Sequence, residues 1–503
     1  MPGNADVQVA RAFHDRTTHT PQSVRTGDHR LDWDSKPFPF KIYPDAPVVA
    51  LPRTFELPGV DTLGALGAAP VASATHLTLE ALAALLYLGA GVTKKLTYPG
   101  GAEVFFRAAP STGALYQTEV YVVAGAVAGL APGVYHFAPG EFVLRRLREG
   151  DVRAALAEAA AEPALARRAA TLALTAIFWR NTWKYRARAW RHLYWDSGTM
   201  LANLTAVGRT LGLAPRVLTG FVDAAVNALL GLDADREAAL ELLALGPEGA
   251  PAPPAAVTEP VAYRALPLSP REVDYPELRA MQAASALEDA AAVVAWRASA
   301  PPPPRASRAE PRPLPPPRTA AERGLGETIQ RRGSTRRFAP RALTAEELAT
   351  VLWWATRPVE ADVPWGFVDP YLLVHAVEGV PAGAWRYWTD RHALELIRAG
   401  EFRRESAFLC LEQALGGDAA AVIYFLAPLD RLLAHYGNRG YRLANLEAGL
   451  VGGRAYLAAY GQRFGATGLT FYDREVVRFF APHAAGLDAI FVTALGRAAR
   501  APR

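Results

Sequence analysis

The sequence has a single cysteine, Cys410, among its 503 residues. One thiol cannot form a disulfide within the chain, and it excludes a zinc site built from clustered cysteines. No metal site is expected. The sequence also lacks an apolar run of the 18 or more residues that a membrane-spanning helix needs. The best apolar stretch, 169–179, is shorter than that and has arginines on both sides.

Lysine is scarce, with only five lysines among the 54 basic residues. The net charge of +5 is small for this length, and no run of like charges concentrates it. Nucleic-acid binding is therefore not expected. The first 24 residues contain no apolar segment of signal-peptide length. We expect a cytoplasmic protein that contacts neither nucleic acid nor a membrane.

The chain contains its own sequence twice. Leu77-Thr78-Leu79-Glu80 recurs 266 positions later as Leu343-Thr344-Ala345-Glu346, and the turn at Gly129 recurs 250 positions later at Gly379. In the middle of each half, Tyr185, Trp190, Arg191 and Gly198 match Tyr436, Tyr441, Arg442 and Gly449. This spacing indicates duplication of a whole domain rather than a solenoid of short repeats. Two homologous halves predict a pseudo-two-fold dimer within one chain.

The two halves have the same predicted order of elements: a helix, two strands, a long helix and a last strand. In the first half these are predicted at 79–89, 119–124, 172–178, 191–211 and 240–245. In the second half they are predicted at 345–355, 371–377, 420–426, 441–464 and 488–495. Mixed helices and strands around a long amphipathic helix indicate an α+β fold, with helices covering a sheet.

Residues 251–320 differ in composition from both halves, which leaves a first domain at 1–250 and a second at 321–503. An alanine-rich segment, 275–298, predicts a helix. It is bracketed by proline-rich stretches at 251–254, 301–304 and 313–317. Proline-rich arms are semi-rigid spacers, so the segment is interpreted as a passive connector. Docking of a proline-recognising partner is the alternative.

A basic motif occurs only in the second half. Arg332, Ser334 and Arg336 alternate within Arg331-Arg332-Gly333-Ser334-Thr335-Arg336-Arg337. In an extended segment they would project to one side. Two guanidinium groups and a hydroxyl suit a phosphate. Taken alone, such a cluster is more typical of a solvated surface.

A small-residue loop occurs only in the first half. It runs from Arg107 to Tyr116, before a predicted strand, and contains Pro110, Ser111, Thr112 and Gly113. Such a loop lets backbone and hydroxyl groups approach a flat ring closely. An ordinary turn has the same composition.

Lys184-Tyr185 is predicted between the end of a strand and the start of the long helix. A desolvated lysine can accept a proton, with the tyrosine as donor or orienting partner. A surface charge at the end of a strand is the alternative.

These motifs together resemble the SagB-type dehydrogenase branch of the nitroreductase-like FMN flavoenzymes. The resemblance covers residues 75–246 and 325–497, with a further match at Phe13-His14-Asp15-Arg16-Thr17. It implies two nitroreductase-like domains, each with helices around a mixed, mainly antiparallel sheet, and FMN at the interface of the pseudo-dimer. It places the basic motif and Arg497 at the phosphate and ribityl chain, and the small-residue loop at the ring. Weaker matches near the flavin are Gln413, Thr470 and Phe471.

The resemblance makes the asymmetry between the halves interpretable. Residues 360–366 stand opposite the small-residue loop without serine or threonine, and residues 66–72 stand opposite the basic motif without arginine. His435-Tyr436 replaces Lys184-Tyr185, and Gly246-Pro247 replaces Gly496-Arg497. All surviving motifs fit one composite site. The opposite interface site is expected to be empty.

The resemblance implies an FMN-dependent oxidoreductase that transfers hydride between substrate and flavin, with Lys184 taking the proton and Tyr185 assisting. Members of that branch oxidise azolines of modified peptides to azoles, and a small nitro compound or quinone is an equal alternative as substrate. No dinucleotide fingerprint follows a strand, so a stably bound nicotinamide is not expected. A non-catalytic flavin-fold scaffold or partner protein is the alternative from another class.

Overall fold

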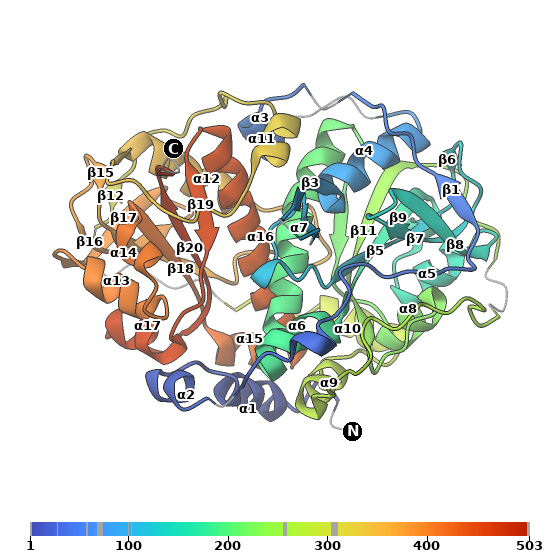
Figure 1. Cartoon of the computed structure of the whole chain (residues 1–503), viewed down its shortest axis with the longest axis horizontal. Helices are drawn as coiled ribbons and strands as arrows, with labels where there is room; N and C mark the ends of the chain where they lie inside the picture. The colour runs from blue at the N-terminus through green and yellow to red at the C-terminus, as the bar shows by residue number, and fades with distance from the viewer. Residues whose placement is uncertain are drawn as a thin grey trace.

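The two halves of the chain fold into two α+β domains that meet along two long helices, α7 (Ala189–Thr210) and α16 (Arg439–Gly461). The computed structural model describes residues 3–27, 29–56, 59–67, 74–98, 100–101, 103–254, 259–302 and 310–499. Figure 1 shows the sheet of the first half on the right and that of the second half on the left, with α7 and α16 between them and α1 and α2 at the lower left. The predicted pseudo-dimer of two α+β domains is confirmed.

Each half is built on an antiparallel sheet with seven strands among the described residues, and the two sheets have matching strand orders. The first order is β1 (Val48–Ala50), β8 (Val143–Glu149), β7 (Gly133–Ala138), β5 (Thr118–Ala124), β9 (Arg168–Ile177), β11 (Glu237–Glu248) and β10 (Arg216–Leu218). The second is β12 (Arg312–Pro313), β17 (Ala393–Ala399), β16 (Gly383–Trp388), β14 (Asp369–Val374), β18 (Ala421–Ala427), β20 (Asp488–Gly496) and β19 (Gly465–Gly468). The duplication therefore extends through the whole sheet.

Isolated parallel bridges join Val217 to Ala361 and Val222 to Leu287. Among the named strands of the described ranges, parallel pairing occurs only in two small sheets. These are β2 (Leu77–Thr78) with β6 (Val127–Ala128), and β13 (Leu343–Thr344) with β15 (Val377–Glu378). A hairpin of β3 (Val92–Thr97) and β4 (Glu103–Arg107) has no counterpart in the described part of the second half. Each half is thus mainly antiparallel, as predicted.

Helices cover these sheets. In the first half they are α1 (Gln8–Arg16), α2 (Pro21–Arg25), α3 (Thr62–Leu66), α4 (Leu79–Ala90), α5 (Arg153–Ala159), α6 (Phe178–Tyr185) and α8 (Asp223–Leu230). After them come α9 (Pro276–Ala284), α10 (Ala290–Arg297), α11 (Leu325–Arg331), α12 (Ala345–Ala355), α13 (Arg403–Leu409), α14 (Ala414–Asp418), α15 (Leu429–Tyr436) and α17 (Asp473–Phe479). Every residue of β5 and β7 is buried, which explains their nearly continuous apolar sequences.

The repeated Leu-Thr dipeptide marks the start of a helix in each half. Thr344 Oγ1 accepts a hydrogen bond from Glu347 N at 3.1 Å, and the Glu347 carboxylate accepts one from Thr344 N at 2.9 Å. In the first half, Thr78 Oγ1 accepts from Ala81 N at 3.2 Å. Such caps stabilise a helix by about 1 kcal/mol. They fix α12 and α4 at equivalent places.

The duplication also includes a helix that precedes each sheet. Arg191 of α7 donates to Thr17 Oγ1, just after α1, at 2.9 Å. Its counterpart Arg442 donates to Ser285 Oγ, just after α9, at 2.8 Å. α9 is therefore the counterpart of α1. The helix predicted at 275–298 is in fact two helices, α9 and α10.

Lys184-Tyr185 does not follow a strand, which corrects the prediction for this segment. β9 ends at Ile177, and the chain turns at once into α6, whose last residue is Tyr185. The apolar run continues into this helix because its first two residues, Phe178 and Trp179, are buried there. The pair thus lies at the end of a helix.

The two central helices cross at the glycines that the sequence repeat matches. A Cβ atom on Gly198 would lie 2.4 Å from the carbonyl oxygen of Leu446, and one on Gly449 would lie 2.3 Å from that of Trp195. Both positions need a residue without a side chain because two helix backbones touch there. The pseudo-two-fold axis passes through this contact.

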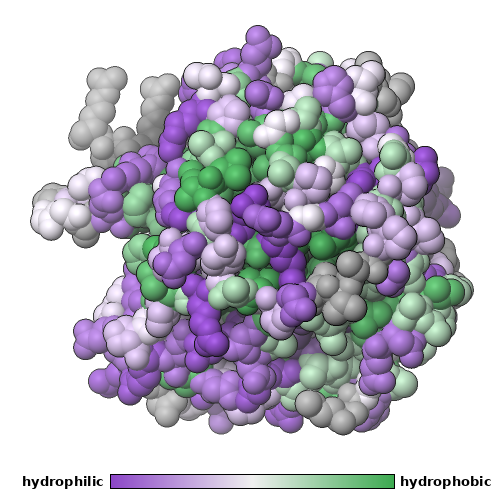
Figure 2. Space-filling view, turned by 90° about the vertical axis from the view of Figure 1, so that its right-hand side faces the viewer, coloured by the Kyte–Doolittle hydropathy of each residue, from purple (hydrophilic) through white to green (hydrophobic). Residues whose placement is uncertain are grey.

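Hydrophobic residues at the surface occur in separate patches. On the face shown in Figure 2, polar residues divide them. Trp33, Phe38 and Tyr98 are among the large hydrophobic side chains that stay exposed. None of the described helices combines the length and the apolar character of a membrane span.

The glycine contact leads to a prediction about stability. Gly449→Ala should lower the free energy of unfolding by roughly 1–3 kcal/mol, because the new methyl group overlaps backbone that cannot move away cheaply. Gly208→Ala, also in a central helix, is the matched control, because its Cβ would meet only side-chain atoms, of Pro215 at 3.4 Å and of Leu245 at 3.7 Å. We expect it to be neutral or stabilising by up to about 1 kcal/mol. Urea unfolding measures both, and equal midpoints would refute the close contact.

Candidate active site between the two halves

A cavity of about 440 Å³ lies beside α7, where loops of both halves meet. Its first-half lining is His19, Pro110, Ser111, Thr112, Gly113, Ala114, Lys184, Tyr185, Trp195, Asp196 and Thr199. Its second-half lining is Ser334, Arg336, Leu411, Gln413, Tyr456, Gly468, Leu469, Thr470 and Phe491. The cavity has the size of a typical small-molecule site. Most of the predicted site residues therefore share one space.

The small-residue loop is held on α7 by Asp196. Ser111 Oγ donates to the Asp196 carboxylate at 2.6 Å, and Thr112 donates to it through both Oγ1, at 2.7 Å, and its backbone N–H. Gln117 Nε2 adds a further bond at 2.7 Å. The hydroxyl groups that we expected at a flat ring thus serve to fix the loop.

Asp196 has a counterpart in the second half, and sequence reasoning missed both. Burial raises the pKa of Asp196 to about 6, against hydrogen bonds that lower it. Glu447, 251 positions later, accepts from the backbone N–H groups of Gly366 and Phe367 at 2.8 and 2.6 Å. Burial raises its pKa to about 7. The available signal was an acidic residue two positions before the matched glycine in each half.

Lys184 is half-buried at the end of α6. Burial lowers the pKa of its ammonium, and the nearby Arg336 lowers it further. Its Nζ lies 5.4 Å from the centre of the Tyr185 ring, and no carboxylate of the described residues pairs with it. Burial raises the pKa of Tyr185. The pKa shifts therefore favour a neutral Lys184 amine beside a protonated Tyr185 hydroxyl.

The residues of the basic motif make two different kinds of contact. Ser334 and Arg336 line the cavity. Arg332 does not, because it ends α11 and donates to the carbonyl oxygens of Arg107 and Ala108, at 2.8 and 3.1 Å. The expectation that both guanidinium groups face one ligand is thus corrected. Arg332 instead ties the second half to the start of the small-residue loop.

Two other predicted residues also lie outside the cavity lining. Arg497 forms an ion pair with Glu347 at 2.7 Å. Phe471 is fully buried, and its ring centre lies 6.1 Å from that of Trp195. The partners of Arg497 and Phe471 are distant in sequence, so these contacts could not be predicted from the local sequence motifs. Phe471 thus supports the cavity wall through Trp195, whereas Arg497 joins the chain after β20 to α12.

Gln413 and Thr470 do lie together. Gln413 Nε2 donates to Thr470 Oγ1 at 3.0 Å and to Cys410 O at 2.8 Å. Next to them Tyr456, from α16, accepts from Gly468 N at 2.6 Å through its hydroxyl. Tyr456 was not predicted, because nothing in a long helix distinguishes one buried tyrosine from another.

The part of the pseudosymmetric position that the structure describes is closed. The loop 360–366 pairs directly with the segment after β10, where Asp362 accepts from the backbone N–H groups of Thr219 and Gly220, each at 2.9 Å. Arg297 Nε also donates to Asp362, at 3.0 Å. Residues 68–72 of the segment opposite the basic motif lie outside the described residues.

The helix α10 fills the rest of that position. A Cβ atom on Gly220 would lie 2.9 Å from the Trp296 ring, so the glycine makes room for the indole. Trp296 Nε1 donates to the carbonyl oxygen of Tyr436 at 3.0 Å. Tyr436 is the counterpart of Tyr185. Among the described residues of this position, side chains thus occupy the space beside Tyr436 that corresponds to the cavity beside Tyr185.

Buried ion pairs hold the two halves together on both sides. Asp473 of the second half binds Arg188 and Arg191 of the first, at 3.0 and 2.5 Å. The counterpart Asp223 binds Arg439 and Arg442, each at 2.6 Å. Although burial opposes them, the arginines hold the pKa of Asp473 at about 2, below its ordinary value. The frame of the interface is symmetric, while the loops on it are not.

Comparison with known proteins assigns both halves to one family. A profile described as Nitroreductase family matches residues 73–246 and 329–496. A protein of Methanocaldococcus jannaschii that is named as a nitroreductase is 30% identical over 161 residues, which are 30% of this chain and 81% of that protein. A crystal structure from Anabaena variabilis, also named as that of a nitroreductase, is 28% identical with a TM-score of 0.76. The similarity covers 98% of this chain and 99% of the Anabaena chain, so it includes both halves.

Asp196 leads to a prediction about pH. A carboxyl whose pKa is raised from 3.8 to about 6 by folding stabilises the fold when protonated, and this contribution is lost as pH rises through that window. In the variant Asp196→Asn the new amide would carry no charge, but it keeps an oxygen for the loop. Between pH 4 and pH 7, this variant should therefore gain about 2–3 kcal/mol in free energy of unfolding relative to the wild type.

Urea unfolding at pH 4, 5, 6 and 7 measures this difference. Asp390→Asn is the control, because the Asp390 side chain is 71% exposed. The free energy of unfolding of Asp390→Asn should change with pH in the same way as that of the wild type. Parallel curves for Asp196→Asn would show that the carboxyl titrates normally in the folded chain.

Proposed function

The chain belongs to the nitroreductase family, and we propose that it is an FMN-dependent oxidoreductase of the SagB-type dehydrogenase kind with one flavin site between its halves. The observation that carries this proposal is the shared cavity. The small-residue loop and Lys184-Tyr185 come to it from the first half, and Ser334 and Arg336 from the second. Neither half alone provides both sets.

The residues of the cavity suit FMN. Arg336 has no ion-pair partner among the described residues, and with Ser334 it would hold the phosphate. Gln413 and Thr470 offer polar groups to the edge of the ring system, and Trp195 and Phe491 offer apolar surface. The loop from Pro110 to Gly113 would lie against the ring. When bound, FMN supplies a ring nitrogen that accepts or donates a hydride.

Lys184 would take the proton that leaves the substrate. Its lowered pKa favours the neutral amine, which is the form that accepts a proton. Tyr185, which keeps its proton, would donate a hydrogen bond to the substrate and orient it. Oxidation of an azoline to an azole removes one hydride and one proton, and therefore suits this pair. A small nitro compound or quinone remains the alternative substrate.

The first test is the flavin stoichiometry. The chain saturated with FMN should hold one flavin per chain, because the pseudosymmetric position is packed with Asp362, Trp296 and Arg297. Flavin released by heat and measured against protein gives the ratio. A ratio of two would contradict the single composite site, and a ratio of zero would favour the non-catalytic scaffold.

Arg336→Ala should lower the FMN affinity, whereas Arg337→Ala, which removes a neighbouring side chain outside the cavity lining, should not.

The second test concerns Lys184. Lys184→Ala should bind FMN normally but should slow flavin reduction by a thiazoline-containing peptide about 10²- to 10⁴-fold, because the variant lacks the proton acceptor. Anaerobic flavin bleaching measures the rate, and dithionite should reduce both proteins equally fast. Lys94→Ala, on the exposed hairpin, is the control. Equal bleaching by the wild type and Lys184→Ala would remove Lys184 from the mechanism.

A further inference from the structure

A second cavity, of about 760 Å³, adjoins the proposed flavin site. The two cavities share three lining residues, His19, Lys184 and Tyr185. The far end of the second cavity is formed by α1, α9 and the turn after α6. A molecule in this cavity can therefore reach the proposed proton acceptor without entering through the flavin site.

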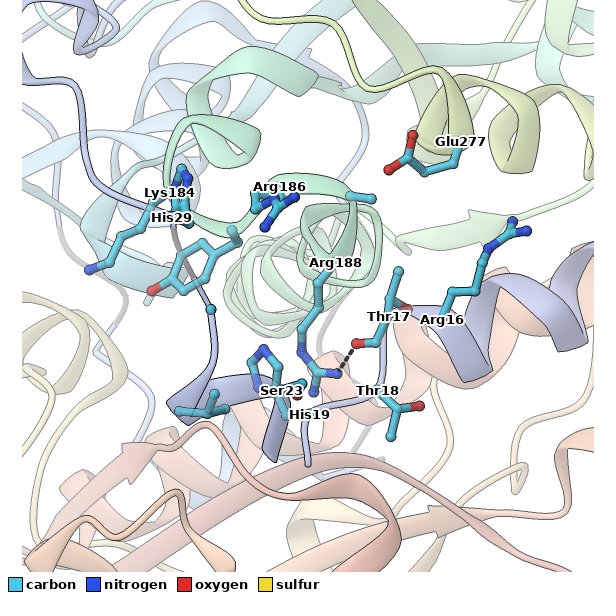
Figure 3. Close-up of a pocket in the computed structure, with 14 residues that line it drawn as sticks. Arg16, Thr17, Thr18, His19, Ser23, His29, Lys184, Arg186, Arg188 and Glu277 are labelled. Atoms are coloured by element: carbon cyan, nitrogen blue, oxygen red, sulfur yellow. Dashed lines mark hydrogen bonds between the residues drawn. The ribbon is translucent and has the colours of Figure 1, made fainter. Parts of the chain in front are cut away.

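The charged side chains around this cavity are mostly cationic. Figure 3 shows Arg16 and Glu277 on one side, Lys184 on the other side, and Arg186 and Arg188 between them. Glu277 is the one carboxylate among the described lining residues. The lining therefore favours a negatively charged ligand.

Three of the basic groups contribute little to this preference, and one of them is Lys184, because its lowered pKa favours the neutral amine. Arg188 is buried and already binds Asp473 at 3.0 Å and the carbonyl oxygen of Thr17 at 2.6 Å. Burial and the neighbouring Arg188 lower the pKa of His19 to about 3, so His19 is neutral. Arg16 is different, because it is exposed at the end of α1 and no described carboxylate pairs with it.

We propose that this cavity binds an anionic group of the substrate, a carboxylate or a phosphate, at Arg16, while the reacting part lies against Lys184 and Tyr185. This rests on the proposed function, since it takes the adjoining cavity as the flavin site. A guanidinium group recognises either anion through paired N–H donors. Because Arg16 is exposed, its contact should change affinity only several-fold.

Three probes of similar shape test the charge preference. They are 4-nitrobenzoate, 4-nitrophenyl phosphate and the neutral 4-nitrobenzamide, titrated calorimetrically into the oxidised, FMN-saturated full-length chain. We expect at least one anion to bind roughly 3- to 10-fold more tightly than the amide. The tighter anion identifies carboxylate or phosphate as the preferred group. Equal dissociation constants for all three probes would overturn the proposal.

Variants locate the anion within the cavity. Arg16→Gln should reduce the preference for the anion roughly 3- to 10-fold, and Glu277→Gln should increase it, because that change removes the opposing charge. Arg25→Gln, at an exposed arginine of α2 outside both cavities, is the matched control. An undiminished preference in Arg16→Gln would place the anion elsewhere and overturn the proposal.

Flavin content separates this proposal from the proposed function. Release of FMN by the anionic probes, or loss of FMN from Arg16→Gln, would show that the basic residues serve the cofactor and would overturn the proposal. A chain that binds no FMN refutes the proposed function instead. The same titrations on that flavin-free chain would still show whether Arg16 selects anions.

Discussion

The contact between α7 and α16 at Gly198 and Gly449 sets the position of the other parts of the site. Two helix backbones that touch cannot slide or rotate far without overlap. Asp196 lies within one turn of Gly198, and the loop that Asp196 holds is therefore fixed relative to α16. Tyr456, on α16, holds the segment at Gly468 on the opposite wall. The contact between the two helices therefore fixes both walls of the cavity relative to each other, although the walls belong to different domains.

At the interface, the buried ion pairs are the same on both sides, while the loops differ. The ion pairs of Asp473 and Asp223 have the same pattern on both sides, because each closes one end of a central helix against the other half. Removing one partner from such a buried pair costs several kcal/mol. The loops on this frame differ between the two sides: Asp196 holds the small-residue loop, whereas Glu447 holds the loop 360–366. Duplication within one chain therefore permits two different sites on one symmetric interface.

The sequence was sufficient to predict features that depend on pattern and spacing. The repeat predicted two α+β domains, and only the structure shows that its matched glycines lie at the helix contact. The sequence was not sufficient to predict contacts for which a side chain has several possible partners distant in the chain. Arg332 could bind a phosphate or a carbonyl group, and only the fold brings Arg107 and Ala108 within its reach. Lys184 was assigned to a strand end because an apolar run does not distinguish a buried strand from a buried helix.

The closed position shows how an interface without the small-residue loop satisfies its buried polar groups. Backbone N–H groups that face a cavity are satisfied by ligand or water, and they become costly if the space is filled by apolar groups alone. At the closed position, Asp362 accepts from Thr219 N and Gly220 N, and Arg297 balances the charge of its carboxylate. Trp296 fills the remaining volume above a glycine. Over the described residues, the side without the small-residue loop is thus a packed and hydrogen-bonded structure in its own right.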